Sequence, residues 1–162
     1  MSEDLNAQIR EMMNLPAETE YIEFKEARND YGFDKVGKYF SALSNEANLH
    51  GKPAGWLIFG VTDKLTRKIV GSNYRLTPPG LDRLKEEIAQ HTNHRITFVA
   101  IHELAVDEKR VVMFEVPPAP RGVPTTWKGI AYGRSHESLE PLALYEIEEI
   151  RRQAPLDDWS AK

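Results

Sequence analysis

The 162-residue chain contains no cysteine. This absence excludes disulfide bonds, thiol catalysis and thiolate metal sites. No apolar run is long enough to cross a bilayer, and the acidic N-terminus does not resemble a signal peptide. We therefore expect no membrane partner and a cytoplasmic location.

The chain also lacks the phosphate-binding loop of nucleotide-hydrolysing enzymes. That loop needs the pattern G-x-x-x-x-G-K-[ST] between a strand and a helix. Gly55 and Gly60 have the glycine spacing, but Val61 replaces the lysine and the segment is β-prone. We therefore expect no ATP site in this chain, and nothing in it predicts an ATPase or a helicase.

Acidic residues are missing from two long stretches, although the net charge is −4. None occurs from Lys64 to Leu81 or from Val116 to His136, while both stretches contain basic residues. The negative net charge argues against a strongly basic nucleic-acid binder. A polyanion can still bind a local basic patch, so ordinary solvated loops and a phosphate-binding surface remain alternatives.

Length and composition predict one soluble globular domain. Hydrophobic residues make up 41% and charged residues 28% of a chain that is long enough to bury a core. We expect this domain to span residues 1–155. Residues 156–162 are expected to be a polar tail or the start of a linker to a downstream domain of a longer chain.

Hydrophobic periodicity predicts helices separated by short strands. Apolar residues at helical spacing mark residues 34–47 as a helix, and a continuous β-prone run marks 56–61 as a central strand. The other helices are expected at 4–14, 77–88 and 142–152, and the other strands at 21–25, 68–71, 96–104, 110–116, 125–127 and 130–133. This order predicts an α+β fold with a mainly antiparallel mixed sheet flanked by helices.

Three acids are candidates for a single site. Glu18 precedes the first strand, Glu23 lies within it, and Asp63 follows the central strand. Acids placed in this way can meet at one sheet edge, where they either hold a divalent metal or are neutralised by basic neighbours. If they hold Mg²⁺ or Mn²⁺, the metal can polarise a phosphate and activate a water for cleavage of RNA or DNA.

Basic residues near these acids are candidates for binding nucleic acid. Most of them lie on two expected hairpins, at 61–71 and 125–133. If both hairpins protrude at one end of the sheet, they form a basic clamp on a phosphate backbone. The candidates are Lys25, Lys64, Arg67, Lys68, Lys128 and Arg134.

Several short motifs occur in an order that resembles a known family. They are Glu23-Phe24-Lys25, Phe40-Ser41-Ala42-Leu43-Ser44-Asn45, Leu57-Ile58-Phe59-Gly60-Val61-Thr62-Asp63, Ile69-Val70-Gly71, Val116-Pro117-Pro118 and Ala131-Tyr132-Gly133-Arg134-Ser135. Over about residues 15–140 this order resembles the Schlafen/AlbA-type DNA-binding domain. That domain opens many bacterial proteins described as transcriptional regulators, divergent AAA ATP-binding proteins or RecG-helicase-related proteins.

The resemblance implies an α+β domain that handles nucleic acid. In animal members of the family, three acids form a metal-dependent endoribonuclease site, and by position those acids resemble Glu18, Glu23 and Asp63. We therefore expect a nucleic-acid-binding (DNA-binding) module of a bacterial transcriptional regulator or RecG-helicase-related protein. One alternative is a metal-dependent endoribonuclease that uses the three acids. Another is a protein-interaction or homodimerisation domain that docks through Met12 and Met13, since methionine suits adaptable interfaces.

Overall fold

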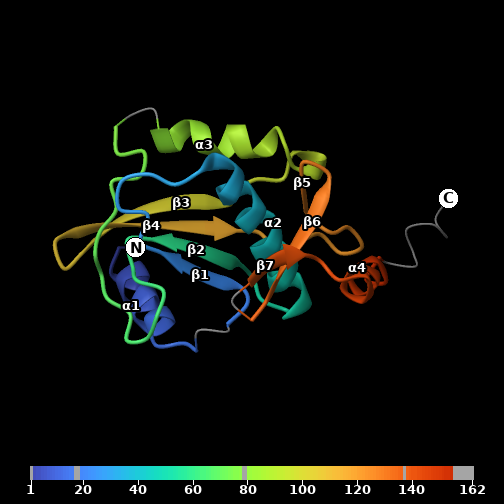
Figure 1. The fold of residues 1–162 in the computed structure, drawn as a ribbon, viewed down its shortest axis with the longest axis horizontal. Coiled ribbons are helices and arrows are strands. Elements are labelled where there is room, and N and C mark those ends of the chain that lie inside the picture. The colour runs from blue at the N-terminus through green and yellow to red at the C-terminus, as the bar shows by residue number, and fades with distance from the viewer. Residues whose placement is uncertain (1, 17–18, 78–79, 137, 155–162) are drawn as a thin grey trace.

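The structure is a computed structural model. It describes residues 2–16, 19–77, 80–136 and 138–154. Within these residues, four α-helices and seven strands form the expected α+β fold (Figure 1). The helices are α1 (Ser2–Met13), α2 (Phe33–Leu49), α3 (Gly80–Ala89) and α4 (Leu144–Arg151), and a short 3₁₀ turn spans Asn93–Arg95. The strands are β1 (Ile22–Lys25), β2 (Gly55–Phe59), β3 (Ala100–Val106), β4 (Lys109–Val116), β5 (Thr126–Trp127), β6 (Ile130–Ser135) and β7 (Ser138–Pro141).

The strands form two sheets in the described part of the chain. The first has the order β1-β2-β4-β3, in which β1 and β2 are parallel and the other pairs are antiparallel. The second sheet, β5-β6-β7, is antiparallel throughout. Strand β1 is thus an edge strand, and its register sets Glu23 beside Leu57 of β2. The sheets are mixed and mainly antiparallel, as predicted.

Helices cover both faces of the four-stranded sheet. Side chains alternate along a strand, so Leu57 and Phe59 of β2 pack with α2 and α3, whereas Ile58 packs with α1. Figure 1 shows α1 on one side of this sheet and α2 and α3 on the other. None of the helices described is long and apolar enough to cross a membrane.

The apolar face of α1 is buried against its own sheet. Ile9 is fully buried and Met12 is 6% exposed, and both pack in the cluster that contains Ile58. Burial of these side chains explains why a helix this short is stable. Met12 is therefore not presented to a partner, whereas Met13 is only half-buried, so of the two methionines named for docking only Met13 has appreciable exposed surface.

Small polar side chains on α2 attach the second sheet. The Ser41 hydroxyl donates to the Thr125 carbonyl at 2.7 Å and accepts from the Tyr132 amide at 2.9 Å. The Asn45 amide group donates to the carbonyls of both Thr125 and Tyr132 at 2.9 Å. Both side chains are fully buried, so these polar positions in the helix fix where β6 lies.

Two segments differ from the sequence-based prediction. Residues 68–71 do not form a strand, because Ile69 makes only an isolated antiparallel bridge with Val61. Strand β7 was not predicted, since most of its residues are exposed and it has no apolar alternation. Its pairing with β6 is a tertiary contact that a local pattern does not reveal.

Candidate functional site

Glu23 is buried at the edge of the sheet, between two basic side chains. It lies on β1 and faces α2, and it is 2% exposed. Its Oε1 is 2.9 Å from Arg134 Nε on β6, and its Oε2 is 3.3 Å from Lys25 Nζ on the same strand. The Lys25 ammonium also lies 5.2 Å from the centre of the Tyr39 ring on α2. Two alternatives were open for Glu23, metal binding and neutralisation by basic neighbours. In the described residues Glu23 is paired with two basic side chains.

Arg134 links three parts of the fold from the interior. Its Nη1 donates to the carbonyls of Thr19 at 2.6 Å and Ile22 at 2.9 Å. Its backbone amide donates to Glu46 Oε2 at 2.9 Å. The residue is only 5% exposed, so its guanidinium joins β6 to β1 and does not reach a ligand at the surface. The sequence had suggested a surface role for it because it ends a strand beside a hairpin.

The pKa of the Glu23 carboxyl lies above its ordinary value, because the effect of burial is larger than that of its two cationic neighbours. Burial raises the pKa of the Glu23 carboxyl, while the charges of Arg134 and Lys25 lower it and the charge of Asp63 raises it. Burial alone would lower the pKa of the Lys25 ammonium, but the charge of Glu23 and the phenolic group of Tyr39 reverse this and raise it. The charge of Asp63 thus acts on the Glu23 carboxyl in the same direction as burial.

Two of the three acids expected to bind a metal, Glu23 and Asp63, lie within the described residues. A divalent cation at Glu23 would meet two cationic groups within 3.3 Å of the carboxylate. Glu18, the third acid, lies outside the described residues. Within the described part of the chain, no grouping of three metal-binding side chains includes Glu23 or Asp63. We therefore assign no metal-dependent step to this arrangement.

Arg67 is also an interior residue. It is 5% exposed and its guanidinium lies 4.4 Å from the centre of the Phe24 ring. It donates to the carbonyls of Met13 at 2.9 Å and Leu15 at 2.6 Å, and to that of Asp63 at 3.2 Å. Arg67 thus ties the end of α1 to the loop at residues 61–69, in place of the surface position expected from the sequence.

The remaining basic candidates lie at two ends of the molecule. Lys64 and Lys68 are exposed on the 61–69 loop, which follows β2. Lys128 lies in the turn between β5 and β6, where its Nζ is 3.1 Å from Asp34 Oδ1. Figure 1 shows the 61–69 loop and the β5–β6 hairpin at opposite ends of the four-stranded sheet. The expected single clamp of two hairpins is therefore wrong.

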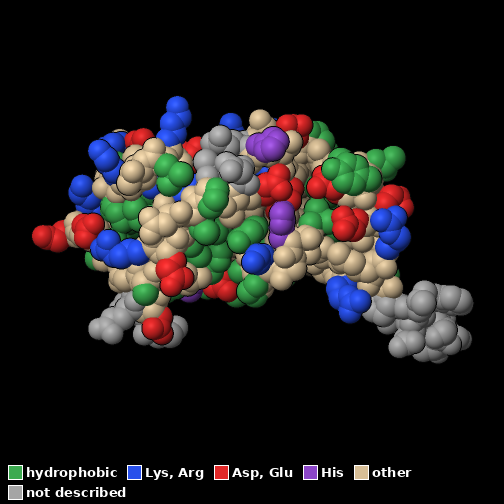
Figure 2. Space-filling view, turned by 90° about the horizontal axis from the view of Figure 1, so that it is seen from below, with side chains coloured by type: hydrophobic (Ala, Val, Ile, Leu, Met, Phe, Trp, Pro, Cys, Tyr) green, Lys and Arg blue, Asp and Glu red, His purple; other side chains and the backbone are tan. Residues whose placement is uncertain are grey.

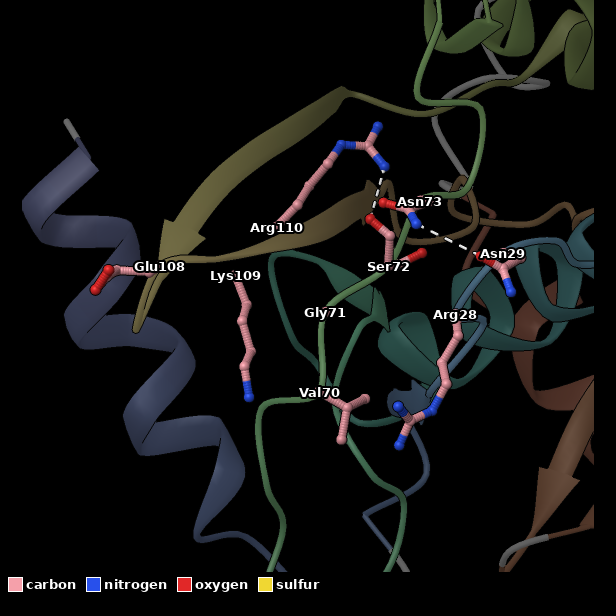
Figure 3. A pocket seen from close by; sticks show the side chains of 9 residues that line it. All are labelled: Arg28, Asn29, Val70, Gly71, Ser72, Asn73, Glu108, Lys109 and Arg110. Atoms are coloured by element: carbon pink, nitrogen blue, oxygen red, sulfur yellow. Dashed lines mark hydrogen bonds between the residues drawn. The ribbon is translucent and has the colours of Figure 1, made fainter.

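A polar pocket of about 460 Å³ adjoins the 61–69 loop (Figure 3). We call it the basic pocket. Its walls come from the segment after β1, from residues 70–73 and from the β3–β4 turn. Its polar lining residues are Arg28, Asn29, Ser72, Asn73, Glu108, Lys109 and Arg110. The Lys109 ammonium lies 3.3 Å from the carbonyl of Ile69, which connects the pocket to the loop.

The basic pocket has one fixed arginine and two cations at its rim. Arg110 donates to the carbonyls of Ser72 at 3.0 Å and Tyr74 at 2.9 Å, and it pairs with Glu103 at 2.9 Å. It therefore holds the wall in place. Figure 3 shows the side chains of Lys109 and Arg28 extending in the same direction on either side of Val70.

Sequence reasoning missed Arg28 and Lys109. They are 81 positions apart, and each adjoins an acid, Glu26 or Glu108, that hides it in a charge profile. In the structure Glu108 points away from the pocket in Figure 3, while Arg28 Nε pairs with Glu26 at 2.9 Å. The one available signal was that Arg28 follows β1 and that Lys109 begins β4 directly after a turn, because segments at strand ends commonly carry binding residues.

Charge is unevenly distributed over the face that carries α1. Figure 2 shows most of the Lys and Arg side chains of this face on its left part, toward the end of the molecule where β3 and β4 join, together with several Asp and Glu side chains. Asp and Glu side chains also gather with a histidine to the right of centre. The left end of this face is thus of mixed charge, and it carries most of the cations in this view.

Comparisons with known proteins agree with this fold. Among solved structures, the DIP2311 protein of Corynebacterium diphtheriae is similar, with a TM-score of 0.61 and 20% identity. The match covers 95% of this chain and 29% of that protein, so the chain spans less than a third of its length. The N-terminal domain of a RecG-related protein of Nitrosomonas europaea has a TM-score of 0.48 and 18% identity, over 83% of this chain and 86% of that one. No curated protein matches the sequence.

The family comparison covers most of the chain. Residues 18–143 match the family model described as Schlafen, AlbA_2. This range runs from before β1 to just before α4 and contains every motif on which the resemblance was based. The chain therefore belongs to the Schlafen, AlbA_2 family.

Proposed function

We propose that this chain binds nucleic acid through the basic pocket and the adjoining 61–69 loop. The observation that carries the proposal is the pocket lined by Arg28 and Lys109, because the contact of Lys109 with the Ile69 carbonyl joins it to the loop that carries exposed Lys64 and Lys68. Nucleic-acid affinity comes largely from cationic side chains that replace counterions on phosphates. A local group of this kind can act despite the net charge of −4.

The loop lysines are well suited to contact phosphates. Both Lys64 and Lys68 are exposed, and neither has an ion pair with an acid among the described residues. Neither lysine therefore has to break an ion pair with a described residue in order to bind a phosphate. The Asn29 and Asn73 side chains add neutral hydrogen-bond donors to the pocket. Such contacts position a backbone and do not read base sequence.

The family supports this assignment in a general way. Its Schlafen, AlbA_2 description and the residues quoted for the resemblance favour a nucleic-acid-binding domain. We further propose that the natural ligand is DNA and that the chain serves as a module of a longer regulatory or RecG-related protein. The size of the similar C. diphtheriae protein, of which the match covers 29%, supports the second point.

The test is a salt titration of binding to labelled duplex DNA, single-stranded DNA and structured RNA, read by fluorescence anisotropy. Affinity is expected to fall linearly with the logarithm of salt concentration. Lys64→Gln and Lys68→Gln together should lower the affinity and reduce the salt slope by about 0.9 for each lost duplex phosphate contact. Lys109→Gln should act in the same direction.

A matched control separates the site from net charge. Arg83→Gln also removes one positive charge, but from an exposed position on α3. This helix covers the face of the four-stranded sheet opposite α1. It should leave affinity and slope nearly unchanged. Equal losses from Arg83→Gln and Lys64→Gln would contradict the proposed site. Metal-dependent fragments that disappear in Asp63→Asn would instead assign a nuclease.

A further inference from the structure

A second group of ligating side chains lies away from the basic pocket. Glu20 precedes β1, and Glu46 and His50 lie one turn apart at the end of α2. One ligand atom from each of the three lies within 4.8 Å of the other two. This group does not include Glu23 or Asp63, and it does not depend on nucleic-acid binding.

The separations in this group are close to those in a metal site. His50 Nε2 is 3.2 Å from Glu20 Oε1 and 3.5 Å from Glu46 Oε1. Zinc binds nitrogen and oxygen ligands at about 2.0–2.2 Å in a tetrahedron, which separates ligand atoms by about 3.3–3.5 Å. Both distances to His50 match this separation, and the two carboxylate oxygens lie within 4.8 Å of each other.

Backbone amides fix both carboxylates in this orientation. Glu46 Oε2 accepts from the Arg134 amide at 2.9 Å, and Glu20 Oε2 accepts from the His136 amide at 3.1 Å. Each carboxylate thus has one oxygen held by the protein and the other directed at His50. Groups that hold the outer atom of a ligand in this way are a regular feature of metal sites.

One carboxylate oxygen of this group accepts no hydrogen bond. The Glu46 side chain is 1% exposed, and the described residues place no hydrogen-bond donor on its Oε1. Its contact with His50 Nε2 is 3.5 Å, beyond a good hydrogen bond. A buried carboxylate oxygen normally has a partner, and this one is directed to the point that the other two ligand atoms share.

We propose that Glu20, Glu46 and His50 bind a divalent transition-metal ion of the zinc type. The imidazole nitrogen favours such an ion over Mg²⁺ or Ca²⁺, which prefer oxygen ligands alone. Three protein ligands leave a fourth position for water. The His50 side chain is 41% exposed, so the ion can enter and exchange from solvent.

The bound ion would connect three segments of the fold. Its ligands join the residue before β1 to the end of α2, and the amides of Arg134 and His136 extend this link to the end of β6. Arg134 in turn contacts Glu23. The ion would therefore stabilise the edge of the sheet at which Glu23 lies.

The test uses untagged protein that has been treated with EDTA and then desalted. Zinc chloride is titrated by calorimetry, and bound zinc is counted by mass spectrometry after dialysis. We expect one zinc per chain and a higher Tm with zinc, because a ligand that binds the folded state stabilises it. Cobalt should give the visible absorption of a site with nitrogen and oxygen ligands.

Variants assign the binding to these side chains. His50→Gln and Glu20→Gln alter exposed or half-buried positions, and each should weaken zinc binding about tenfold or more. His102→Gln is the matched control, because His102 also contacts a glutamate, Glu115 at 3.0 Å, but has no third ligand among the described residues. It should bind zinc as the wild type does. Absence of saturable binding, or equal binding in all three variants, would overturn the proposal.

Discussion

Arg134 Nε lies 2.9 Å from Glu23 Oε1, and both side chains are 2% exposed. Neither atom has an aligned hydrogen bond within the described residues, so the contact is an ion pair whose N–H does not point at the oxygen. A buried ion pair contributes little net stability, but removal of one partner leaves an uncompensated charge. Two residues of the family motifs thus depend on each other inside the fold.

Removal of Arg134 alone should strongly lower the stability of the protein. Arg134→Met removes the main cation beside Glu23 and the hydrogen bonds to Thr19 and Ile22. We expect the free energy of unfolding to fall by about 3–5 kcal/mol. Urea denaturation followed by circular dichroism measures this change.

Two further variants test the cause of that loss. Adding Glu23→Gln to Arg134→Met removes the unpaired charge and should recover part of the stability. Arg151→Met breaks an exposed pair with Glu148 and should cost less than about 1 kcal/mol. If Arg134→Met lowers only nucleic-acid affinity and leaves stability intact, the interior role is incorrect.

Arg67 should not tolerate replacement by lysine. A guanidinium can donate to the carbonyls of Met13, Leu15 and Asp63 and still stack on a ring, whereas an ammonium cannot match this planar geometry. Arg67→Lys should lower the opening free energy of α1 by about 1–3 kcal/mol. Hydrogen exchange of the α1 amides detects this change. The exposed substitution Lys64→Arg should leave exchange unchanged, and equal exchange in both variants would contradict the assignment.

Gly37 should not tolerate a methyl group, although it lies within α2. Alanine favours a helix over glycine by about 1 kcal/mol, but a Cβ at Gly37 would overlap the ring of Trp127. Trp127 is 1% exposed and its Nε1 donates to Asp34 Oδ1 at 2.8 Å, so the ring cannot move freely. Gly37→Ala should therefore destabilise the protein by about 1–3 kcal/mol in thermal or urea unfolding. Lys35→Ala, on the exposed side of the helix, should change stability by less than about 0.5 kcal/mol.

Glu46 should make stability depend on pH near neutrality. Burial raises the pKa of its carboxyl from 4.5 to about 7, against the lowering effect of the hydrogen bond from Arg134. The folded state then binds more protons than the unfolded state between these two values, so stability falls as pH rises through this window. In EDTA, the loss attributable to Glu46 should be on the order of 3 kcal/mol.

Comparison with Glu46→Gln isolates this effect. Glutamine keeps an acceptor for the Arg134 amide but does not titrate. Urea unfolding at intervals between pH 4.5 and 7 should therefore show a smaller decline for the variant. Parallel declines in the two proteins would show that Glu46 does not titrate in this range.

The residues of the proposed nucleic-acid interface were only partly predictable from the sequence. Exposed Lys64 and Lys68 were expected from an acid-free stretch, and they remain candidates. Arg67 and Arg134 also lie in acid-free stretches, but both are buried, because each donates hydrogen bonds to backbone carbonyls of distant segments. A charge profile cannot distinguish these cases, since the carbonyls that each guanidinium meets are supplied by other parts of the chain.

Local pattern determined most elements of this protein, with β7 and residues 68–71 as the exceptions. Apolar periodicity marked the helices and strands, and Lys128-Gly129 forms the predicted turn, with positive φ at both residues. The ordered family motifs also fixed the α+β class. These features follow from interactions between near neighbours in the chain, which a sequence displays directly.

Tertiary structure alone decided which charges are available for binding. It paired Glu23 with Arg134, placed the two hairpins at opposite ends, and brought Arg28 to Lys109 and Glu20 to His50. Each relationship joins residues that are far apart in the chain, and whether a charge is buried depends on everything packed around it. The physical reason is that packing, and not residue type, sets how much water each charged group keeps.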